Sequence, residues 1–304
     1  MDDFAVVIPT RNGGAQVQRL FASLQAQSLQ PQQVLVIDST SKDQTAAWAK
    51  EFGFHLEIIP AASFNHGGTR QSAATQLAVS FLIYLTQDVL LADSEAFAKL
   101  LRPFQDSSVS AVYGRQLPHQ NAGLLGAHAR IFNYGPESVV KSLDDAPRYG
   151  LKTAFLSNSF AAYRRSDLIA VGGFPATTIL SEDMYVAAKL LLAGKKIAYQ
   201  AEAKVYHSHD YTMLQEFQRY FDIGVFQARE LWIRETFGQA EGEGARFVKS
   251  ELAYLWCKGA ILQIPGAMLR TLAKFLGYRL GFKESKIPLY LKKKFSMCKG
   301  YWRQ

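Results

Sequence analysis

The first third of the chain alternates short apolar runs with segments whose apolar residues recur at helical spacing. The apolar runs predict strands at 4–8, 34–37, 56–59 and 81–85. The segments between them predict helices at 15–27, 43–52 and 69–78. This alternation predicts an α/β fold built on a parallel sheet that is covered on both faces, because its strands are apolar throughout.

The middle of the chain is less regular, and the end is helical. Further strands are predicted at 109–114, 160–163, 197–199 and 203–206, and helices at 125–133 and 182–193. Beyond Asp210 the pattern becomes helical and aromatic, with a break at Glu241-Gly242-Glu243-Gly244. We therefore predict an α/β domain over 1–212 and a helical region over 213–304.

Composition excludes several classes of protein. The chain has 304 residues, 48% of them hydrophobic, and two cysteines, which give neither a disulfide framework nor a metal-binding spacing and fit a reducing compartment. Met1-Asp2-Asp3 is acidic where a secretory signal would be basic, so none is expected. A membrane span is not expected either, because no run of about 18 uncharged apolar residues occurs.

The positive charge is concentrated at the end of the chain. From Arg270 onward there are ten Lys or Arg residues and one acid, Glu284, against a formal net charge of +8 for the whole chain. The segment Ala253–Tyr278 mixes large apolar and basic residues, which predicts a helix lying in a membrane interface. The alternative is an appendage that packs on the α/β domain or forms a dimer. A nucleic-acid partner is not expected, because no such motif is present.

Polar groups follow the first two predicted strands. Pro9, Thr10 and Arg11 follow the first strand, and Asp38 and Ser39 follow the second. Ligands of open α/β sheets bind at the carboxyl ends of strands, so this pair predicts a nucleotide site. A dinucleotide such as NAD is disfavoured because no G-x-G-x-x-G follows the first strand. A plain strand-to-helix turn is the alternative.

Three later segments carry candidate chemistry. Asp88, in Thr86-Gln87-Asp88, follows a buried strand, where one carboxylate can hold a divalent cation on a pyrophosphate. Asp183, in Ser181-Glu182-Asp183 at a helix start, can be a general base or a helix cap. In His207-Ser208-His209, strand alternation would place both imidazoles on one face, as metal ligands, phosphate contacts or a surface pair.

The order of these motifs resembles the family 2 glycosyltransferases with the GT-A fold, over about residues 4–210. The resemblance implies that Asp88 binds Mg²⁺ or Mn²⁺ and that Asp183 deprotonates the acceptor hydroxyl, with inversion at the anomeric carbon. It implies nucleotide binding by Pro9, Thr10, Arg11, Asp38, Ser39 and Gln87. Thr86 replaces the first acid of the family's D-x-D, so His209 would assist Asp88 at the metal.

Three further segments resemble bacterial rhamnosyltransferases that use dTDP-L-rhamnose. They are Phe64-Asn65-His66-Gly67-Gly68-Thr69-Arg70, which reads as a tight Gly-Gly turn into a helix, Tyr113–Pro118 and Asn158–Arg165. The resemblance implies that His66 and Arg70 contact the nucleotide and that Arg115 and Gln116 lie near the diphosphate or the rhamnose. Acceptor contacts would come from Ser157, Asn158 and Glu182.

The function implied by this resemblance is inverting transfer of L-rhamnose to a glycan, in O-antigen or capsule synthesis. The acceptor would be linked to undecaprenyl diphosphate, and the protein would lie on the inner face of the cytoplasmic membrane. One alternative keeps the fold with a UDP-hexose or UDP-N-acetylhexosamine donor. Another is a non-catalytic, membrane-associated scaffold of a glycan assembly complex. The oligomeric state stays open.

Overall fold

The computed structural model describes residues 3–238 and 242–303. Within these residues the centre is a nine-stranded sheet with the order β3-β2-β1-β4-β8-β6-β9-β5, and β7 pairs with β9. The strands are β1 Phe4–Thr10, β2 Gln33–Asp38, β3 His55–Ile58, β4 Phe81–Leu85, β5 Leu90–Leu91, β6 Val109–Leu117, β7 Val139–Lys141, β8 Phe160–Arg164 and β9 Lys196–Tyr206.

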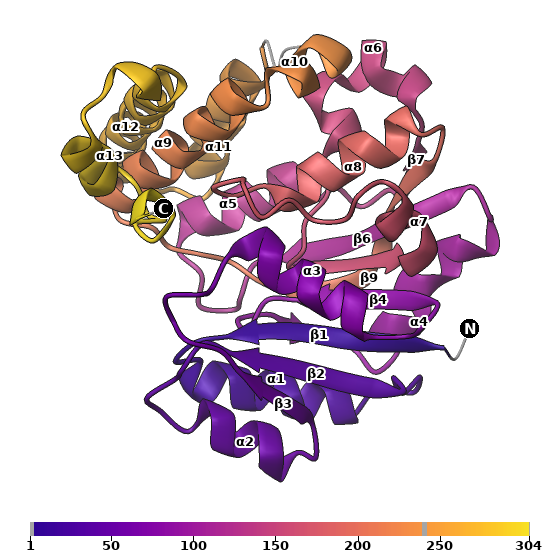
Figure 1. Ribbon diagram of the computed structural model, residues 1–304. Helices are drawn as coiled ribbons and strands as arrows, with labels where there is room; N and C mark the ends of the chain where they lie inside the picture. The colour runs from indigo at the N-terminus through magenta and orange to yellow at the C-terminus, as the bar shows by residue number, and fades with distance from the viewer. Residues whose placement is uncertain (1–2, 239–241, 304) are drawn as a thin grey trace.

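Helices cover both faces of the sheet (Figure 1). They are α1 Gly14–Gln25, α2 Thr45–Glu51, α3 His66–Gln76, α4 Ala96–Leu101, α5 Leu124–Asn133, α6 Ala146–Tyr149, α7 Arg165–Ala170, α8 Glu182–Leu192, α9 Met213–Arg229, α10 Leu231–Phe237, α11 Glu243–Cys257, α12 Ile264–Phe282 and α13 Leu289–Phe295. Strand alternation divides the core: Val6 and Ile8 pack with α1, α2 and α4, whereas Ala5 and Val7 pack with α3, α7 and α8.

The predicted parallel sheet is confirmed for β1 to β4 and for β6 with β9, but it is wrong at β8, which runs antiparallel to β4 and β6. The chain enters β8 beside the end of β4, where Phe160 pairs with Leu85. It therefore arrives at the carboxyl edge of the sheet and must run back. This reversal puts Ser157 and Asn158 at the edge where ligands of α/β proteins bind.

The two strands predicted at 197–199 and 203–206 are one continuous strand, β9. β9 pairs with β6 on both sides of a register shift between Gly114 and Arg115, so the two strands stay hydrogen-bonded along their length. The strand ends at Tyr206, so the predicted placement of His207 and His209 on a strand is wrong. Both histidines lie in the connection between β9 and α9.

The predicted Gly-Gly turn is also wrong, because Gly67 and Gly68 form the first turn of α3. The side chain of Asn65 caps this helix and accepts a hydrogen bond from Gly68 N at 2.8 Å. A Cβ on Gly67 would lie 1.8 Å from the carbonyl oxygen of Pro175. Glycine is needed here for the close approach of the loop around Pro175 to α3, not for a turn.

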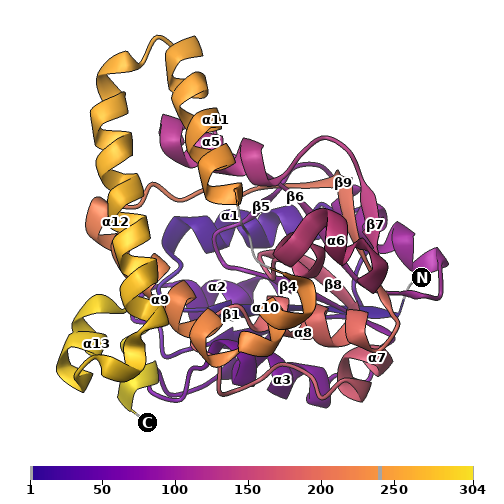
Figure 2. The same ribbon diagram turned by 90° about the horizontal axis from the view of Figure 1, so that it is seen from above.

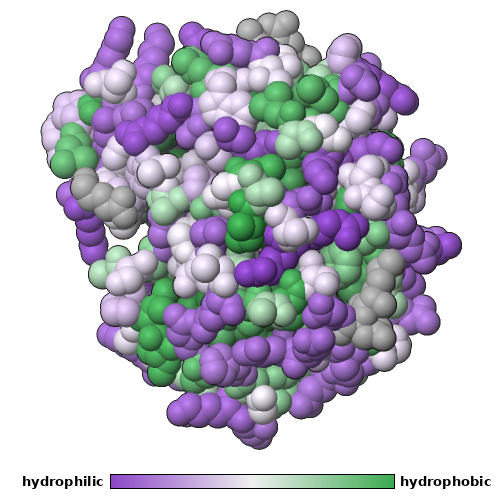
Figure 3. Space-filling model, turned by 45° about the vertical axis from the view of Figure 1, so that its right-hand side comes forward, coloured by the Kyte–Doolittle hydropathy of each residue, from purple (hydrophilic) through white to green (hydrophobic). Residues whose placement is uncertain are grey.

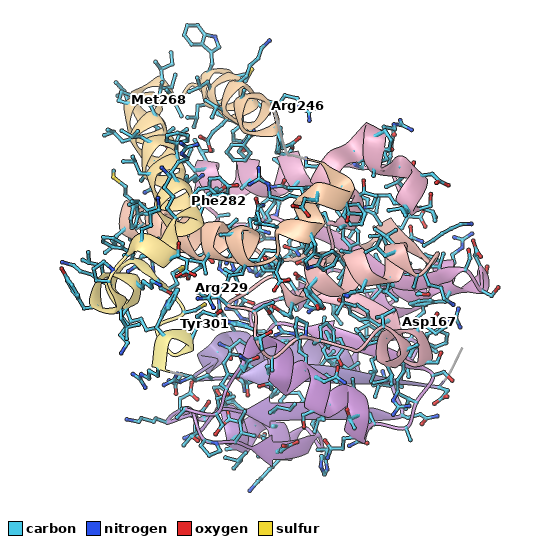
Figure 4. The ribbon with its side chains drawn as sticks, turned by 45° about the horizontal axis from the view of Figure 1, so that its top comes forward. Asp167, Arg229, Arg246, Met268, Phe282 and Tyr301 are labelled. Atoms are coloured by element: carbon cyan, nitrogen blue, oxygen red, sulfur yellow. The ribbon has the colours of Figure 1, made fainter. Side chains whose placement is uncertain are left out.

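The helical region begins with α9, which crosses α12 at close range. Cβ atoms added to Gly224, Gly277 and Gly281 would lie 2.3, 2.3 and 2.0 Å from backbone oxygens of the facing helix, so these glycines allow the contact. The end of the chain folds back on α9, where Arg229 donates a hydrogen bond to Tyr301 at 2.5 Å (Figure 4).

The segment 253–278, predicted as one helix, is not a single helix. α11 ends at Cys257, Gly259 has φ +68°, and α12 begins at Ile264, so the segment is a helical hairpin (Figure 2). Within the described residues no helix is both long enough and apolar enough to cross a bilayer. Of the predicted features, Met1, Asp2 and Glu241 lie outside the described residues, and Gly242 precedes α11.

Candidate active site

A cavity of about 1090 Å³ lies at the carboxyl edge of the sheet and is lined by both regions of the chain. The α/β part contributes Asp88, Asp183 and His209, and the helical region contributes Arg219 and Lys274. The helical region therefore forms a wall of the cavity that faces the carboxyl ends of the strands.

Asp88, His207 and His209 form a cluster of potential metal ligands. Oδ2 of Asp88 lies 3.3 Å from Nε2 of His207 and 3.5 Å from Nε2 of His209. One ligand atom from each of the three residues falls within 4.8 Å of the others. Sequence analysis had assigned Asp88 and His209 to the metal, and the structure adds His207 as a third member.

Gln116 fixes the tautomer of His207. Nη1 of Arg130 donates to Oε1 of Gln116 at 2.6 Å, and since a guanidinium only donates, the facing amide atom is the oxygen. Nδ1 of His207 lies 2.8 Å from the same oxygen and must therefore carry the proton. Nε2 therefore faces Asp88: without a metal it can donate a hydrogen bond to the carboxylate, and after losing its proton it can bind a cation, as in a metal-binding histidine whose other nitrogen is held by a hydrogen bond.

One carboxylate and two imidazoles fit a divalent cation. Burial opposes ionisation of Asp88, but the hydrogen bond and the positive charge of His207 hold its pKa well below the usual range. Burial lowers the pKa of His209 to about 4, which leaves this imidazole neutral and able to bind a metal. Carboxylate oxygen and imidazole nitrogen are both ligands of transition metals such as Mn²⁺.

Asp183 lies across the cavity at the start of α8. Its Oδ2 accepts a hydrogen bond from Asn158 N at 3.0 Å, and its Oδ1 accepts one from Met184 N at 2.8 Å. Burial and the negative charge of Glu182 raise the pKa of Asp183 to about 7, although these two N–H groups favour the ionised form. A fixed carboxyl group with a pKa near neutrality suits a general base.

Glu182 is not free to act in the same way, because it is paired with Arg70. Its Oε1 lies 3.1 Å from Nη1 of Arg70, and both side chains are almost fully buried. Burial opposes ionisation, but Arg70, His66 and the amide of Asn158 together lower the pKa of Glu182. Glu182 is therefore the ionised neighbour that raises the pKa of Asp183.

Strained backbone occurs beside these residues. Among the described non-glycine residues, Asn12, Thr40 and Ser181 have positive φ angles, of 48°, 55° and 59°. Asparagine adopts this region more readily than most residues, so the outliers that signal strain are Ser181 and above all the β-branched Thr40. The three residues stand next to Arg11, Ser39 and Glu182, so all three adjoin predicted site residues, as strained residues at functional sites often do.

The predicted nucleotide residues form a second cluster at the ends of β1, β2 and β4. Oδ1 of Asp38 accepts from Thr10 Oγ1 at 3.0 Å, and Ser39 N donates to the carbonyl of Thr10 at 2.8 Å. Gln87 joins the cluster by exchanging two hydrogen bonds with the backbone of Arg11. The Arg11 side chain is exposed at this edge, where Pro9 is partly buried.

The remaining predicted residues fall into three places. Ser157 and Asn158 line the cavity with Asp183. The structure brings His66 and Arg70 to Glu182 in the same cavity, although sequence analysis had assigned them to the nucleotide. Gln116 is buried, does not line the cavity, and donates a hydrogen bond to Ser157 Oγ at 2.9 Å. Arg115, its neighbour on β6, is partly buried and does not line this cavity.

Sequence analysis missed the basic residues that α5, α9 and α12 contribute to the cavity. Arg130 on α5, Arg219 on α9, and Arg270 and Lys274 on α12 all line the cavity. Arg270 donates to the carbonyl of Tyr211, and Lys274 lies 3.4 Å from Glu216. The excess of basic residues at the end of the chain was the available signal, but it does not tell which of them face inward.

The mixed sheet with helices on both faces and a C-terminal helical region is the fold of a glycosyltransferase of the GT-A type. The mannosyltransferase PcManGT of Pyrobaculum calidifontis, solved with GDP-mannose and Mn²⁺, shares this fold, with a TM-score of 0.66 at 14% identity over 93% of this chain and 88% of that one. Residues 5–172 match "Glycosyl transferase family 2", and the chain belongs to that family.

Two bacterial relatives match almost the whole chain. The chain is 50% identical to the O-antigen chain rhamnosyltransferase WbaN of Salmonella anatum, over 99% of this chain and 96% of that protein. It is also 50% identical to the O-antigen chain rhamnosyltransferase RfbN of Salmonella typhimurium, over 98% of this chain and 95% of that protein. Both matches include the C-terminal helices, so the likeness extends beyond the GT-A part.

Proposed function

We propose that this glycosyltransferase transfers L-rhamnose from dTDP-β-L-rhamnose to a growing O-antigen chain. The observation that carries this proposal is the identity of 50% to two O-antigen chain rhamnosyltransferases over nearly the full length. That coverage includes the helical wall of the cavity.

In the proposed reaction Asp183 is the general base. The acceptor hydroxyl oxygen attacks the anomeric carbon, the bond from that carbon to the dTDP oxygen breaks, and the hydroxyl proton passes to Asp183. Attack on the face opposite the leaving group inverts the anomeric centre and gives an α-L-rhamnoside. The N–H groups of Asn158 and Met184 hold the carboxylate in position, which supports this role.

Charge on the departing diphosphate needs a positive partner. We infer that Asp88, His207 and His209 hold a divalent cation, Mg²⁺ or Mn²⁺, which when bound would offset the charge of the dTDP leaving group. Thr86 leaves Asp88 as the single carboxylate, and the two imidazoles complete the set. With two nitrogen ligands, Mn²⁺ suits this cluster better than Mg²⁺.

The nucleotide is assigned to the cluster at the ends of β1, β2 and β4, formed by Pro9, Thr10, Arg11, Asp38, Ser39 and Gln87. Residues 86–88 support this assignment, because Gln87 bonds to Arg11 while Asp88 lines the cavity. A nucleotide bound at this cluster would extend its diphosphate toward the metal ligands. Arg115 and Gln116 remain assigned to the diphosphate and sugar side, and Gln116 would act there through His207.

The acceptor is assigned to the cavity beside Ser157, Asn158 and Glu182, enclosed by the C-terminal helices. Its volume of about 1090 Å³ accommodates several sugar units. We propose that the acceptor is linked to undecaprenyl diphosphate and that the protein lies on the inner face of the cytoplasmic membrane. The proposed division into a catalytic domain at 1–212 and a helical region at 213–304 assigns the acceptor wall to the second part.

The test compares donors on the purified protein with a lipid-linked O-antigen acceptor. dTDP-rhamnose should support transfer, and UDP-glucose, UDP-galactose and UDP-N-acetylglucosamine should not. Preference for a UDP-sugar would contradict the proposal that dTDP-rhamnose is the donor, but the protein would still be a glycosyltransferase. No transfer with any donor or acceptor, from protein that binds dTDP, would favour the scaffold.

A further inference from the structure

Helix α12 turns an apolar face to solvent. Its large apolar side chains are exposed on the side that faces away from α9, and they are Met268, Leu269, Leu272, Phe275, Leu276 and Leu280. The side that packs on α9 carries the small residues Gly277 and Gly281. Figure 4 shows Met268 near the outer end of the helix. Helices of soluble proteins show the reverse pattern, with the apolar stripe toward the core.

The exposed residues form one continuous stripe. Met268, Leu272, Leu276 and Leu280 are spaced four residues apart, so they lie in a row along the helix. Leu269 and Phe275 widen this row on either side. An exposed apolar stripe that follows most of a 19-residue helix is larger than the scattered apolar residues of ordinary surfaces.

The tip of the α11–α12 hairpin continues this surface. Trp256, Ile261 and Leu262 are exposed there, and the side chain of Leu262 is 96% exposed. Figure 2 shows the hairpin projecting from the rest of the molecule. On the face that Figure 3 presents, by contrast, hydrophobic patches are small and separated by hydrophilic residues.

The segment that carries this surface is basic, and its exposed charges are Lys258, Arg279 and Lys283. Between Glu251 and Glu284 the chain has no acidic residue and five basic ones. Arg279 and Lys283 are exposed, and by helical spacing they fall within the apolar stripe of α12. A second copy of the same surface would bring like charges together, whereas an anionic lipid surface is complementary to both the apolar stripe and the basic residues.

We propose that the outward face of α12 and the tip of the α11–α12 hairpin dock into the surface of an anionic lipid bilayer. Leu262 enters the boundary between headgroups and acyl chains, and Arg279 and Lys283 meet the lipid phosphates. The docking specifies which surface of the protein and which class of lipid would place the protein on the membrane. It rests on the proposed function only for the reason why the protein would bind a membrane. Arg270 and Lys274 line the cavity from the inner side of α12, so docking brings the acceptor cavity beside the headgroups.

The test is sedimentation of the full chain with sucrose-loaded vesicles, without donor or acceptor. One set of vesicles has equal parts phosphatidylcholine and phosphatidylglycerol, and the other has phosphatidylcholine alone. The variants are Leu262→Glu at the tip and Leu272→Glu on α12. The matched control is Ile169→Glu, which changes an exposed apolar residue on α7, on the other side of the molecule (Figure 1).

We expect wild type to bind the anionic vesicles and to lose binding in phosphatidylcholine alone. Each Leu→Glu change should lower the partition coefficient by roughly tenfold, because a buried leucine is lost and a like charge is added to the lipid surface. The double variant Arg279→Gln, Lys283→Gln should lower the partition coefficient by more than tenfold, because each lost cation accounts for roughly fivefold. Ile169→Glu should bind as wild type does.

Failure of wild type to sediment with anionic vesicles would overturn the proposal, as would unchanged binding by both Leu→Glu variants. A concentration-dependent dimer that Leu272→Glu dissociates, without vesicle binding, would assign the face to a second copy instead. Circular dichroism and thermal unfolding establish that each variant is folded. Because no sugar is transferred in the assay, the rhamnosyl proposal can fail while vesicle binding stands, and the reverse also holds.

Discussion

Glu182 and Arg70 form a buried ion pair of 3.1 Å, and Glu182 is the residue immediately before the proposed base, Asp183. The pair keeps a negative charge next to Asp183, and this charge adds to burial in raising the pKa of Asp183 to about 7. The state of the base is therefore set by its neighbours and can be changed without touching it.

The first prediction concerns pH. A general base acts only when ionised, so kcat/KM should fall by about tenfold per pH unit below the pKa of Asp183, and should level off above it. The measurement is a pH profile of rhamnosyl transfer at low donor concentration, with folding followed over the same range. Activity that stays constant from pH 5 to pH 8 (roughly two units below that pKa to one above) would contradict the assignment.

The second prediction shifts that profile in two directions. Glu182→Gln removes a negative charge and should move the acidic limb to lower pH, whereas Arg70→Gln removes a positive charge and should move it to higher pH. Each change leaves one buried charge unpaired and should lower the free energy of unfolding by about 3–5 kcal/mol. Shifts of the same sign in both variants would show that the pair does not act on Asp183 through charge.

The third prediction separates the base from its surroundings. Asp183→Asn should lower kcat by at least about a hundredfold, the lower range for loss of general-base catalysis, and should leave Mn²⁺ and dTDP affinity near wild type. Calorimetric titration gives both affinities. A variant with wild-type transfer would remove Asp183 from the reaction.

The fourth prediction concerns the metal. Gln116→Ala should weaken Mn²⁺ binding by about 10- to 100-fold, because His207 would no longer be held in the tautomer with a free Nε2. Asp88→Asn should abolish binding. Gln87→Ala is the control, since Gln87 is adjacent to Asp88 but bonds to the backbone of Arg11. Equal losses in the two glutamine variants would mean that the effect is not specific to His207.

The fifth prediction uses two adjacent glycines. Gly67→Ala should lower the free energy of unfolding by about 1–3 kcal/mol, because its Cβ would overlap the carbonyl of Pro175 and backbone must move. Gly68→Ala should cost little, since its Cβ would lie 3.4 Å from Asn65 Oδ1 and alanine favours the helix. Urea titration compares the two. Similar stabilities for both variants would argue against the close contact at Pro175.

The sequence predicted most elements because local pattern determines them. The apolar runs of β1, β2 and β4 and the helical spacing of α1 and α8 are properties of short segments. The direction of β8 is not a property of a short segment, because it depends on which edge of the sheet the preceding loop reaches. The same holds for Gly67, because the contact that requires a glycine there is with Pro175, more than a hundred residues away in the sequence.

The candidate site divides in the same way. The positions of Asp38, Asp88 and Asp183 were predictable because Asp38 ends β2, Asp88 follows β4 and Asp183 lies in the first turn of α8. The pairing of Arg70 with Glu182 was not, since it requires α3 and α8 to meet. The basic residues of α12 could be counted in the sequence, but which of them face the cavity depends on how α12 crosses α9.

The connection between β9 and α9 has a consequence for how the chain can be divided. His209 stands three residues before Thr212, whose side chain caps α9. Tyr211, between them, stacks on His209 and accepts a hydrogen bond from Arg270 of α12. The junction of the two regions is thus also the support of His209, a proposed metal ligand. A protein cut there would lose the helical wall of the cavity and, with it, the contacts that align the imidazole of His209, which the shorter fragment still carries.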